Sequence, residues 1–545
     1  MKKEVEGKIV DIYNKEIFEG AVVIDDARIV GFKRCSTTAK GYIIPGFIDA
    51  HVHIESSMLT PRHFGELIMA QGTLAIVTDP HEIANVMGVK GINFMMDNSA
   101  ESPVKMYFSI PSCVPSTPFD VAGDIVSAAD VEQLAATGRF VALSEMMNVP
   151  GVLNGDADVV AKLKAANKYH LPIDGHSPGL NGKDLETYIK YGVSTDHECF
   201  SLVEAEEKIK SGMKILIREG SAARNYEGLK QLISKYPDKL MFCTDDAHPD
   251  DIIERGHIDK MVRRAVADGF DLFDVLKIAT VNAIEHYNLN DVGRLRIGDK
   301  ADFIIVEDLT SFHTEKVFVD GVLCFDADNK EQYAGTTADA EVVFNHFDHD
   351  KIDLSALRKP VKKQTIAIEL IKNELLTNVY SYIPKVAMDN FESDMQQDMA
   401  KIVYINRYNN GAPQVALCKG FGLNKGAFAS SVAHDTHNII AIGCSDMDLC
   451  RVINALIESK GGLAACDGQT TEVLPLPIGG IMSNRSGHEV ASEYKRLSGI
   501  VNQLGCQLNA PFMTLSFMSL VVIPEIKIGE KGLFSYSAFD WIEKN

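Results

Sequence analysis

The sequence predicts an α/β fold: a (β/α)8 TIM-like barrel with a small flanking β domain and a C-terminal α+β domain. Three observations lead to this prediction. Eight short apolar runs alternate with helix-like stretches in residues 43–290, short strand patterns lie on both sides of that region, and the pattern changes again after about residue 330. With 545 residues the chain is too long for one hydrophobic core, so we expect two or three domains.

Short strand patterns flank the central region on both sides. Apolar and polar residues alternate in residues 8–12, 20–24 and 28–32, and a similar pattern returns in residues 301–306 and 317–321. We expect residues 1–42 and 291–330 to pair into one small β domain.

The central region, residues 43–290, alternates strand and helix patterns in the way that is typical of a (β/α)8 barrel. Its apolar runs end in polar or ionisable residues and occupy residues 43–53, 74–82, 105–110, 140–145, 171–176, 193–198, 214–219 and 240–246. Amphipathic helix patterns, such as residues 158–168 and 203–211, lie between several of them. Eight strand–helix units in about 250 residues match a (β/α)8 barrel, although the strand count alone leaves a doubly wound open sheet as an alternative.

Residues 340–545 mix β-like and helical patterns, including residues 366–371 and 447–459, which predicts a third, α+β domain.

The 75 acidic and 54 basic residues give a formal charge of −21, which argues against a nucleic-acid partner. The ten cysteines are scattered without a C-x-x-C pair, as in reduced proteins. No run approaches the roughly 18 apolar residues of a membrane span, and no signal-peptide pattern is present, so we expect a cytoplasmic protein without a membrane partner.

Six ionisable residues stand at the carboxyl ends of predicted strands, where the active site of a (β/α)8 enzyme gathers. They are His51, His53, Glu145, His176, His197 and Asp245. His51 and His53 are two residues apart on a strand, so both side chains point to one face. Imidazole and carboxylate groups suit divalent transition metals, and a shared Glu145 would let six ligands hold two ions. Two adjacent cations would lower the pKa of a bridging water and supply hydroxide at neutral pH.

Each of these residues also has a structural interpretation when it is taken alone. An H-x-H pair is weak evidence, a single His176 or His197 is more often a hydrogen-bonded structural histidine, and Glu145 alone can form an ion pair. All six at successive strand ends favour the metal site.

Several motifs carry a resemblance to known families. Residues 45–53 and 293–302 resemble the opening signature of the amidohydrolase superfamily and its return into the flanking β domain. Residues 78–86, 194–198, 243–249 and 431–438 resemble, more narrowly, the bacterial adenine deaminase family. The resemblance spans nearly the whole chain.

The resemblance implies a binuclear centre of Mn²⁺ or Fe²⁺ rather than Zn²⁺. His51 and His53 would hold the first ion with Asp245, and His176 and His197 the second. Glu145 would bridge the ions where related enzymes use a carbamylated lysine, because no lysine ends the fourth strand. The expected reaction is hydrolytic deamination of adenine to hypoxanthine, with Glu145 and Asp245 as catalytic residues, Asp245 acting as general base and then acid. We also expect a homo-oligomer.

Other polar residues near the predicted barrel mouth have two interpretations. His81 and Glu82 follow the second strand and either begin a helix or hold the purine edge, and the same choice applies to Arg218, Glu219 and Ser221. His434, Asp435 and His437 fit an exposed turn, a further metal site or a lid over the barrel.

Two other functions remain open at this point. The same cage would suit a cyclic amide or imide hydrolase of the dihydroorotase or hydantoinase type. A metal-binding protein without catalysis is the alternative from another class. A proton-shuttling Asp245 favours an enzyme, since a pure metal binder needs no such group.

Overall fold

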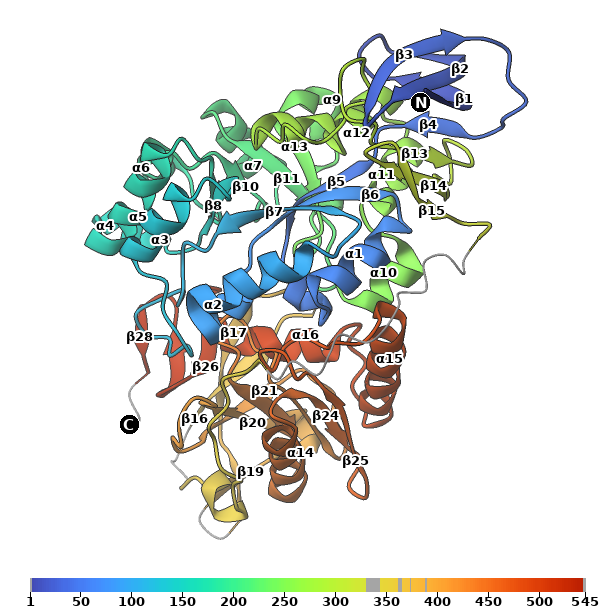
Figure 1. Ribbon diagram of the computed structural model, residues 1–545. Coiled ribbons are helices and arrows are strands. Elements are labelled where there is room, and N and C mark those ends of the chain that lie inside the picture. Colours follow the sequence, from blue (N-terminus) through green and yellow to red (C-terminus); the bar gives the residue numbers. More distant parts are fainter. Residues whose placement is uncertain (1, 330–343, 361–364, 373, 388–389, 543–545) are drawn as a thin grey trace.

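The computed structural model describes residues 2–329, 344–360, 365–372, 374–387 and 390–542. The predicted boundary between residues 330 and 340 lies outside the described residues, and the other predicted domain limits stay predictions. The three parts of the fold are visible in Figure 1, with the barrel at the centre, a small β domain at one end and the C-terminal domain below.

Eight parallel strands form the barrel. They are β5 (Phe47–Val52), β6 (Thr73–Thr78), β7 (Lys105–Ile110), β8 (Ala142–Met146), β9 (Ile173–Gly175), β10 (Thr195–Asp196), β11 (Lys214–Arg218) and β12 (Leu240–Cys243). Strands β5 to β9 form one sheet and β10 to β12 another. Parallel bridges join Ile173 to Val193 and Val52 to Asp245, so the two sheets close into a ring. The predicted barrel is confirmed, and the open doubly wound sheet is wrong.

Helices cover the outside of the barrel. They are α1 (Pro61–Met69), α2 (His81–Ser99), α3 (Ala128–Ala136), α4 (Val149–Asn154), α5 (Ala157–Lys168), α6 (Gly182–Lys190), α7 (Leu202–Lys210), α8 (Tyr226–Leu229), α9 (Leu232–Lys235), α10 (Pro249–Arg255), α11 (Ile258–Ala267), α12 (Leu272–Ile278) and α13 (Val281–His286). Helix α5 illustrates why these segments form helices. Asp156 caps its free N–H groups, and Val159, Leu163 and Ala166 form its buried face.

The small β domain is one seven-stranded sheet built from both sides of the barrel segment. Its order is β15 (Val322–Asp326), β14 (Thr314–Val319), β13 (Phe303–Val306), β4 (Tyr42–Ile44), β1 (Lys3–Asp11), β2 (Glu16–Asp25) and β3 (Arg28–Arg34). The antiparallel pairing of β4 with β13, with Ile44 opposite Ile304, joins the two segments. The predicted association of the two flanking segments is confirmed.

The C-terminal domain is built on an eight-stranded sheet. Its order is β17 (Thr377–Tyr382), β16 (Thr365–Leu370), β21 (Gln414–Lys419), β20 (Met399–Ile405), β23 (Ile439–Gly443), β22 (Ala427–Ser430), β24 (Gly462–Cys466) and β25 (Thr471–Pro475). The remaining elements are β18 (Lys385–Ala387), β19 (Asn390–Glu392), α14 (Asp446–Ser459), α15 (Gly487–Gln503), α16 (Pro511–Ser516), β26 (Ile526–Gly529), β27 (Gly532–Ser535) and β28 (Asp540–Trp541). The predicted patterns at 366–371 and 447–459 correspond to β16 and α14.

The C-terminal domain contacts the barrel through the loops that follow the barrel strands. Ser483 N donates to Met58 O at 2.8 Å, and Asn438 Nδ2 donates to Val121 O at 3.0 Å. Figure 1 shows α16 and β26 lying just below the barrel. Among the described helices, none is long and apolar enough to cross a membrane.

Candidate active site at the mouth of the barrel

Glu145, at the end of β8, lies between two pairs of histidines. Its Oε1 is 3.2 Å from His53 Nε2 and 3.8 Å from His51 Nε2. Its Oε2 is 2.8 Å from His176 Nδ1 and 3.3 Å from His197 Nε2. Each oxygen therefore faces one pair, and a carboxylate in this position can bridge two cations.

Asp245 follows β12 and completes the first of these pairs. Its Oδ1 is 3.1 Å from His53 Nε2 and 3.4 Å from His51 Nε2, while Arg218 Nη1 donates to its Oδ2 at 2.7 Å. Burial raises the pKa of the Asp245 carboxyl, but the Arg218 guanidinium and the two imidazoles outweigh burial and hold this pKa well below its usual range. Asp245 is thus ionised at neutral pH.

The residues present fit a pair of divalent cations. The buried Nε2 atoms of His51 and His176 have no hydrogen-bond partner among the described residues, although buried polar atoms are normally paired. Burial lowers the pKa of His197, but Glu145, Asp245 and Glu198 outweigh it and raise it to about 9. Protons thus balance the carboxylates, and metal ions would displace these protons on binding. The groups that can hold an ion include His51, His53 and Asp245, and His51, Glu145 and His197.

Asp79 and Glu198 support this cluster, and sequence reasoning gave neither of them a role. Asp79 O lies 3.1 Å from His53 Nδ1, so that ring turns Nε2 toward Glu145 and Asp245. Asp79 Oδ2 lies 2.8 Å from His81 Nδ1. Both contacts follow from the Thr-Asp-Pro-His-Glu segment after β6, a signal that was present in the sequence.

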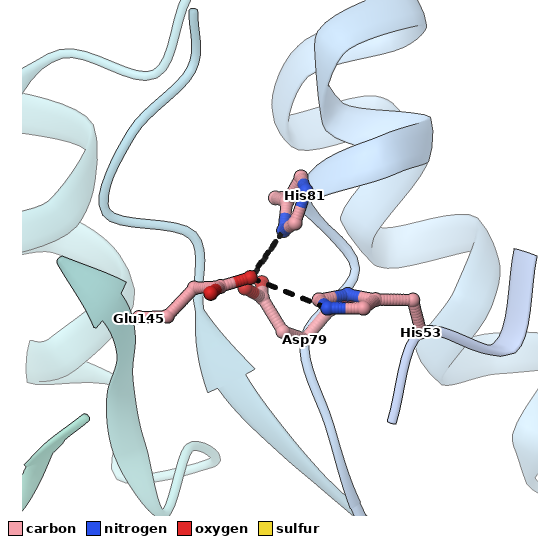
Figure 2. A group of neighbouring side chains, drawn as sticks. All are labelled: His53, Asp79, His81 and Glu145. Carbon is pink, nitrogen blue, oxygen red and sulfur yellow. Dashed lines mark hydrogen bonds and ion pairs between the residues drawn. The ribbon is translucent and has the colours of Figure 1, made fainter. Parts of the chain in front are cut away.

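Figure 2 shows His53, which follows β5, and His81, at the start of α2, both reaching Glu145, with Asp79 beside them. His81 Nδ1 is 3.7 Å from Glu145 Oε1, and His81 Nε2 is 3.3 Å from Glu82 Oε1. His81 therefore lies directly beside the candidate metal ligands, at the start of α2.

Glu198 forms a buried ion pair with Arg218 beside the second histidine pair. Both Nη atoms of Arg218 donate to the Glu198 carboxylate, and Glu198 Oε1 is 3.4 Å from His197 Nε2 and 3.7 Å from His176 Nδ1. Arg218 thus binds two buried carboxylates at once, which fixes Asp245 and Glu198 relative to each other.

A cavity of about 350 Å³ opens above this cluster. Barrel residues form its floor, and the C-terminal domain contributes the opposite wall through Leu375, His434, Asp435, Phe517, Leu520 and Ile523. Arg218 and Glu82 line the cavity, whereas Glu219 and Ser221 do not.

The two residues outside the cavity have other partners. Arg264 donates to Glu219 Oε2 at 3.3 Å, and Ser221 Oγ accepts from His248 N at 2.9 Å. Their predicted contact with substrate has no support in this geometry and stays a prediction.

Residues 431–438 join β22 to β23 and lie over the barrel mouth. His434 Nδ1 is 2.6 Å from Glu82 Oε1, and His437 Nε2 contacts Glu82 Oε2. Burial raises the pKa of Glu82, but these two imidazoles outweigh it and hold the pKa well below its usual range. His434, Asp435 and His437 are buried, so the interpretation of this segment as an exposed turn is wrong.

A buried ion pair between Lys208 and Asp196 holds the residues next to His197 in place. Lys208 Nζ on α7 contacts Asp196 Oδ2 and donates to Ser177 O at 2.6 Å, and Asp196 Oδ1 accepts from Glu198 N at 2.9 Å. Burial raises the pKa of Asp196, but the Lys208 ammonium outweighs it and lowers this pKa to about 2. The pair fixes the backbone on both sides of His197.

Removing the Lys208 ammonium should therefore leave an uncompensated buried carboxylate. We expect Lys208→Met to lower the free energy of unfolding by about 3–5 kcal/mol. Lys208→Met combined with Asp196→Asn removes both charges and should recover most of this loss. Urea unfolding at pH 7 measures both effects, with the exposed Lys210→Met as a matched control.

The pH dependence gives a second check of this ion pair. In Lys208→Met, burial still raises the pKa of Asp196, while His197 and the Glu198 N–H still lower it, so without the ammonium this pKa should rise from its value of about 2 in the unaltered chain. The loss of unfolding free energy in Lys208→Met is therefore full at pH values above that raised pKa. This loss becomes smaller as the pH falls below it, because the carboxyl of Asp196 takes up a proton. A double variant as unstable as Lys208→Met would show that the charge of Asp196 is not the cause.

Comparisons with known proteins agree with this architecture. Residues 42–324 match the model of the amidohydrolase family, and residues 374–540 match that of the adenine deaminase C-terminal domain. The chain is 47% identical to the adenine deaminase of Methanosarcina acetivorans over 100% of this chain and 99% of that protein. It is 47% identical to that of Sulfurovum sp. and 43% identical to that of Borreliella burgdorferi, over 99% of both chains in each case. The family and the buried histidine and carboxylate groups indicate binding of divalent metal. The chain belongs to the adenine deaminase family of amidohydrolases.

Proposed function

We propose that this chain hydrolyses adenine to hypoxanthine and ammonia. The observation that carries the proposal is the cavity in which Glu145 lies between two histidine pairs and the C-terminal domain forms the opposite wall. Full-length similarity to proteins named adenine deaminases supports adenine over a cyclic amide or imide as the substrate. Membership of the amidohydrolase family and the names of these relatives support an enzyme over a protein that only binds metal.

In this proposal, His51, His53 and Asp245 would hold one metal ion, His176 and His197 would hold the second, and Glu145 would be shared between them. When bound, two such cations lower the pKa of a water molecule and so supply hydroxide at neutral pH. The resemblance to the adenine deaminase family supports Mn²⁺ or Fe²⁺ over Zn²⁺, whereas the nitrogen and oxygen ligands suit all three ions.

Asp245 moves the proton in the proposed reaction. The water oxygen bonds to C6 of adenine while the π electrons of the C6–N1 double bond move to N1, and Asp245 accepts the proton that the water loses. Asp245 then passes this proton to the amino nitrogen on C6. The electron pair on N1 re-forms the C6–N1 double bond as the bond from C6 to the amino nitrogen breaks, so ammonia leaves and hypoxanthine forms as its 6-hydroxy tautomer. Arg218 Nη1 donates to Asp245 Oδ2 at 2.7 Å and holds the carboxylate in position for these transfers.

The polar side chains above the metal ligands would hold the base. His81, Glu82 and Arg218 line the cavity and are the sequence-predicted residues available for this role. The expected homo-oligomer and the cytoplasmic location stay predictions.

Removal of the metal ions tests whether the proposed reaction depends on them. Exhaustive chelation should abolish ammonia release from adenine, and two equivalents of Mn²⁺ or Fe²⁺ per chain should restore it. Because the imidazole ligands must lose protons to bind metal, metal affinity should rise with pH. Full activity in metal-free protein, or faster turnover of dihydroorotate than of adenine, would contradict the proposal.

Asp245→Asn separates proton transfer from metal binding. The amide keeps the size and one oxygen ligand but loses the proton acceptor, so we expect near-normal metal content and a kcat lower by at least about 100-fold. Asp251→Asn, on α10, is the matched control. If Asp245→Asn keeps both metals and most of its rate, the proton passes through another group, and Asp246 and His248 are the next to test.

A further inference from the structure

Asp435 is a carboxylate of the cavity wall with an unused oxygen. Its Oδ1 is 3.8 Å from His81 Nε2, and its buried Oδ2 has no hydrogen-bond partner among the described residues. No other carboxylate oxygen lining the cavity is both buried and unpartnered in the described part of the chain. Because an unpaired buried acceptor costs free energy, its retention at a ligand cavity indicates that a ligand donates to it.

The segment that carries Asp435 is held in place before any ligand arrives. Glu82 binds His434 and His437 on either side of Asp435. Tyr408 Oη donates to Thr436 O at 2.6 Å. A fixed acceptor loses little conformational freedom on binding and therefore discriminates strongly between ligands.

Asp435 is separated from the reacting centre by the ring of His81. One nitrogen of that ring is 3.7 Å from Glu145 Oε1, and the other is 3.8 Å from Asp435 Oδ1. Phe517 and Leu520 supply apolar cavity wall on the same side. A flat bicyclic base with its reacting carbon at Glu145 and Asp245 would extend its second ring toward Asp435.

We propose that Asp435 Oδ2 accepts a hydrogen bond from the N–H of the five-membered ring of a free purine base, so that Asp435 selects free bases over N9-substituted ones. This inference rests on the proposed function. A free purine carries an N–H on that ring, whereas a nucleoside or a 9-alkylpurine does not. A substituted base would leave the acceptor unpaired and would place its substituent against the carboxylate.

The test compares adenine with 9-methyladenine in the metal-loaded full chain. For Asp435→Ala we expect kcat/KM for adenine to fall about 10- to 100-fold, the range for a hydrogen bond to a charged group. The loss should appear mainly in KM, since the contact is remote from the reacting carbon. The kcat/KM for 9-methyladenine should stay level or rise, so the preference for the free base shrinks by at least about 10-fold.

Two further variants control for structure. Asp435→Asn keeps the size of the side chain and a neutral acceptor, so it should fold normally and shift the same ratio in the same direction by a smaller factor. Asp467→Asn, in the exposed turn between β24 and β25, should leave the ratio unchanged.

Three outcomes would overturn the inference. An equal loss on both bases would show a structural role for Asp435, and loss of a bound metal ion from Asp435→Asn would show a cation ligand. An unchanged ratio in both variants would remove Asp435 from base recognition. Absence of ammonia release from adenine by the unaltered chain is a separate result, because it refutes the proposed function itself and with it the base that Asp435 would contact.

Discussion

The site depends on the backbone pairing between the end of β5 and residue Asp245, which closes the barrel at its mouth. Asp245 N donates to His51 O and His53 N donates to Asp245 O, both at 3.0 Å. This pairing closes the ring of strands and at the same time places two imidazoles beside one carboxylate. Asp49, fully buried, reinforces the closure by accepting from His51 N at 3.2 Å and from Thr244 N at 3.1 Å. The contacts that close the barrel therefore also bring together His51, His53 and Asp245, the first group of candidate metal ligands.

Buried charge is the cost of this arrangement, and the fold offsets it with matched partners. Glu145 and Asp245 are balanced by imidazoles, Arg218 binds Asp245 and Glu198, and Lys208 binds Asp196. Such pairs add little net stability, because desolvation consumes most of the Coulomb attraction. These pairs instead hold the charged side chains in fixed positions. The C-terminal domain adds to this arrangement, because it covers the cavity and supplies His434 and His437 as partners of Glu82.

The barrel and its ligand cluster were predictable because both follow from short segments. Strand periodicity located all eight strands, and the rule that parallel strands present their carboxyl ends at one edge brought His51, His53, Glu145, His176, His197 and Asp245 together. The Thr-Asp-Pro-His-Glu segment put Asp79 at the end of β6, but periodicity encodes neither the contact of its backbone carbonyl with His53 nor the ion pair of Glu198 with Arg218. Glu82 and His434 are 352 residues apart, so no local pattern could pair them or reveal Asp435 as cavity wall.

The central claim is that Glu145 bridges two metal ions held by the two histidine pairs. Anomalous X-ray diffraction at the manganese edge, on crystals of the Mn²⁺-loaded chain, tests it most directly. The account predicts two peaks, each at a bonding distance of roughly 2.0–2.3 Å from one Glu145 oxygen. One peak should lie beside His51, His53 and Asp245 and the other beside His176 and His197. A single peak, or two ions neither of which touches Glu145, would contradict the account.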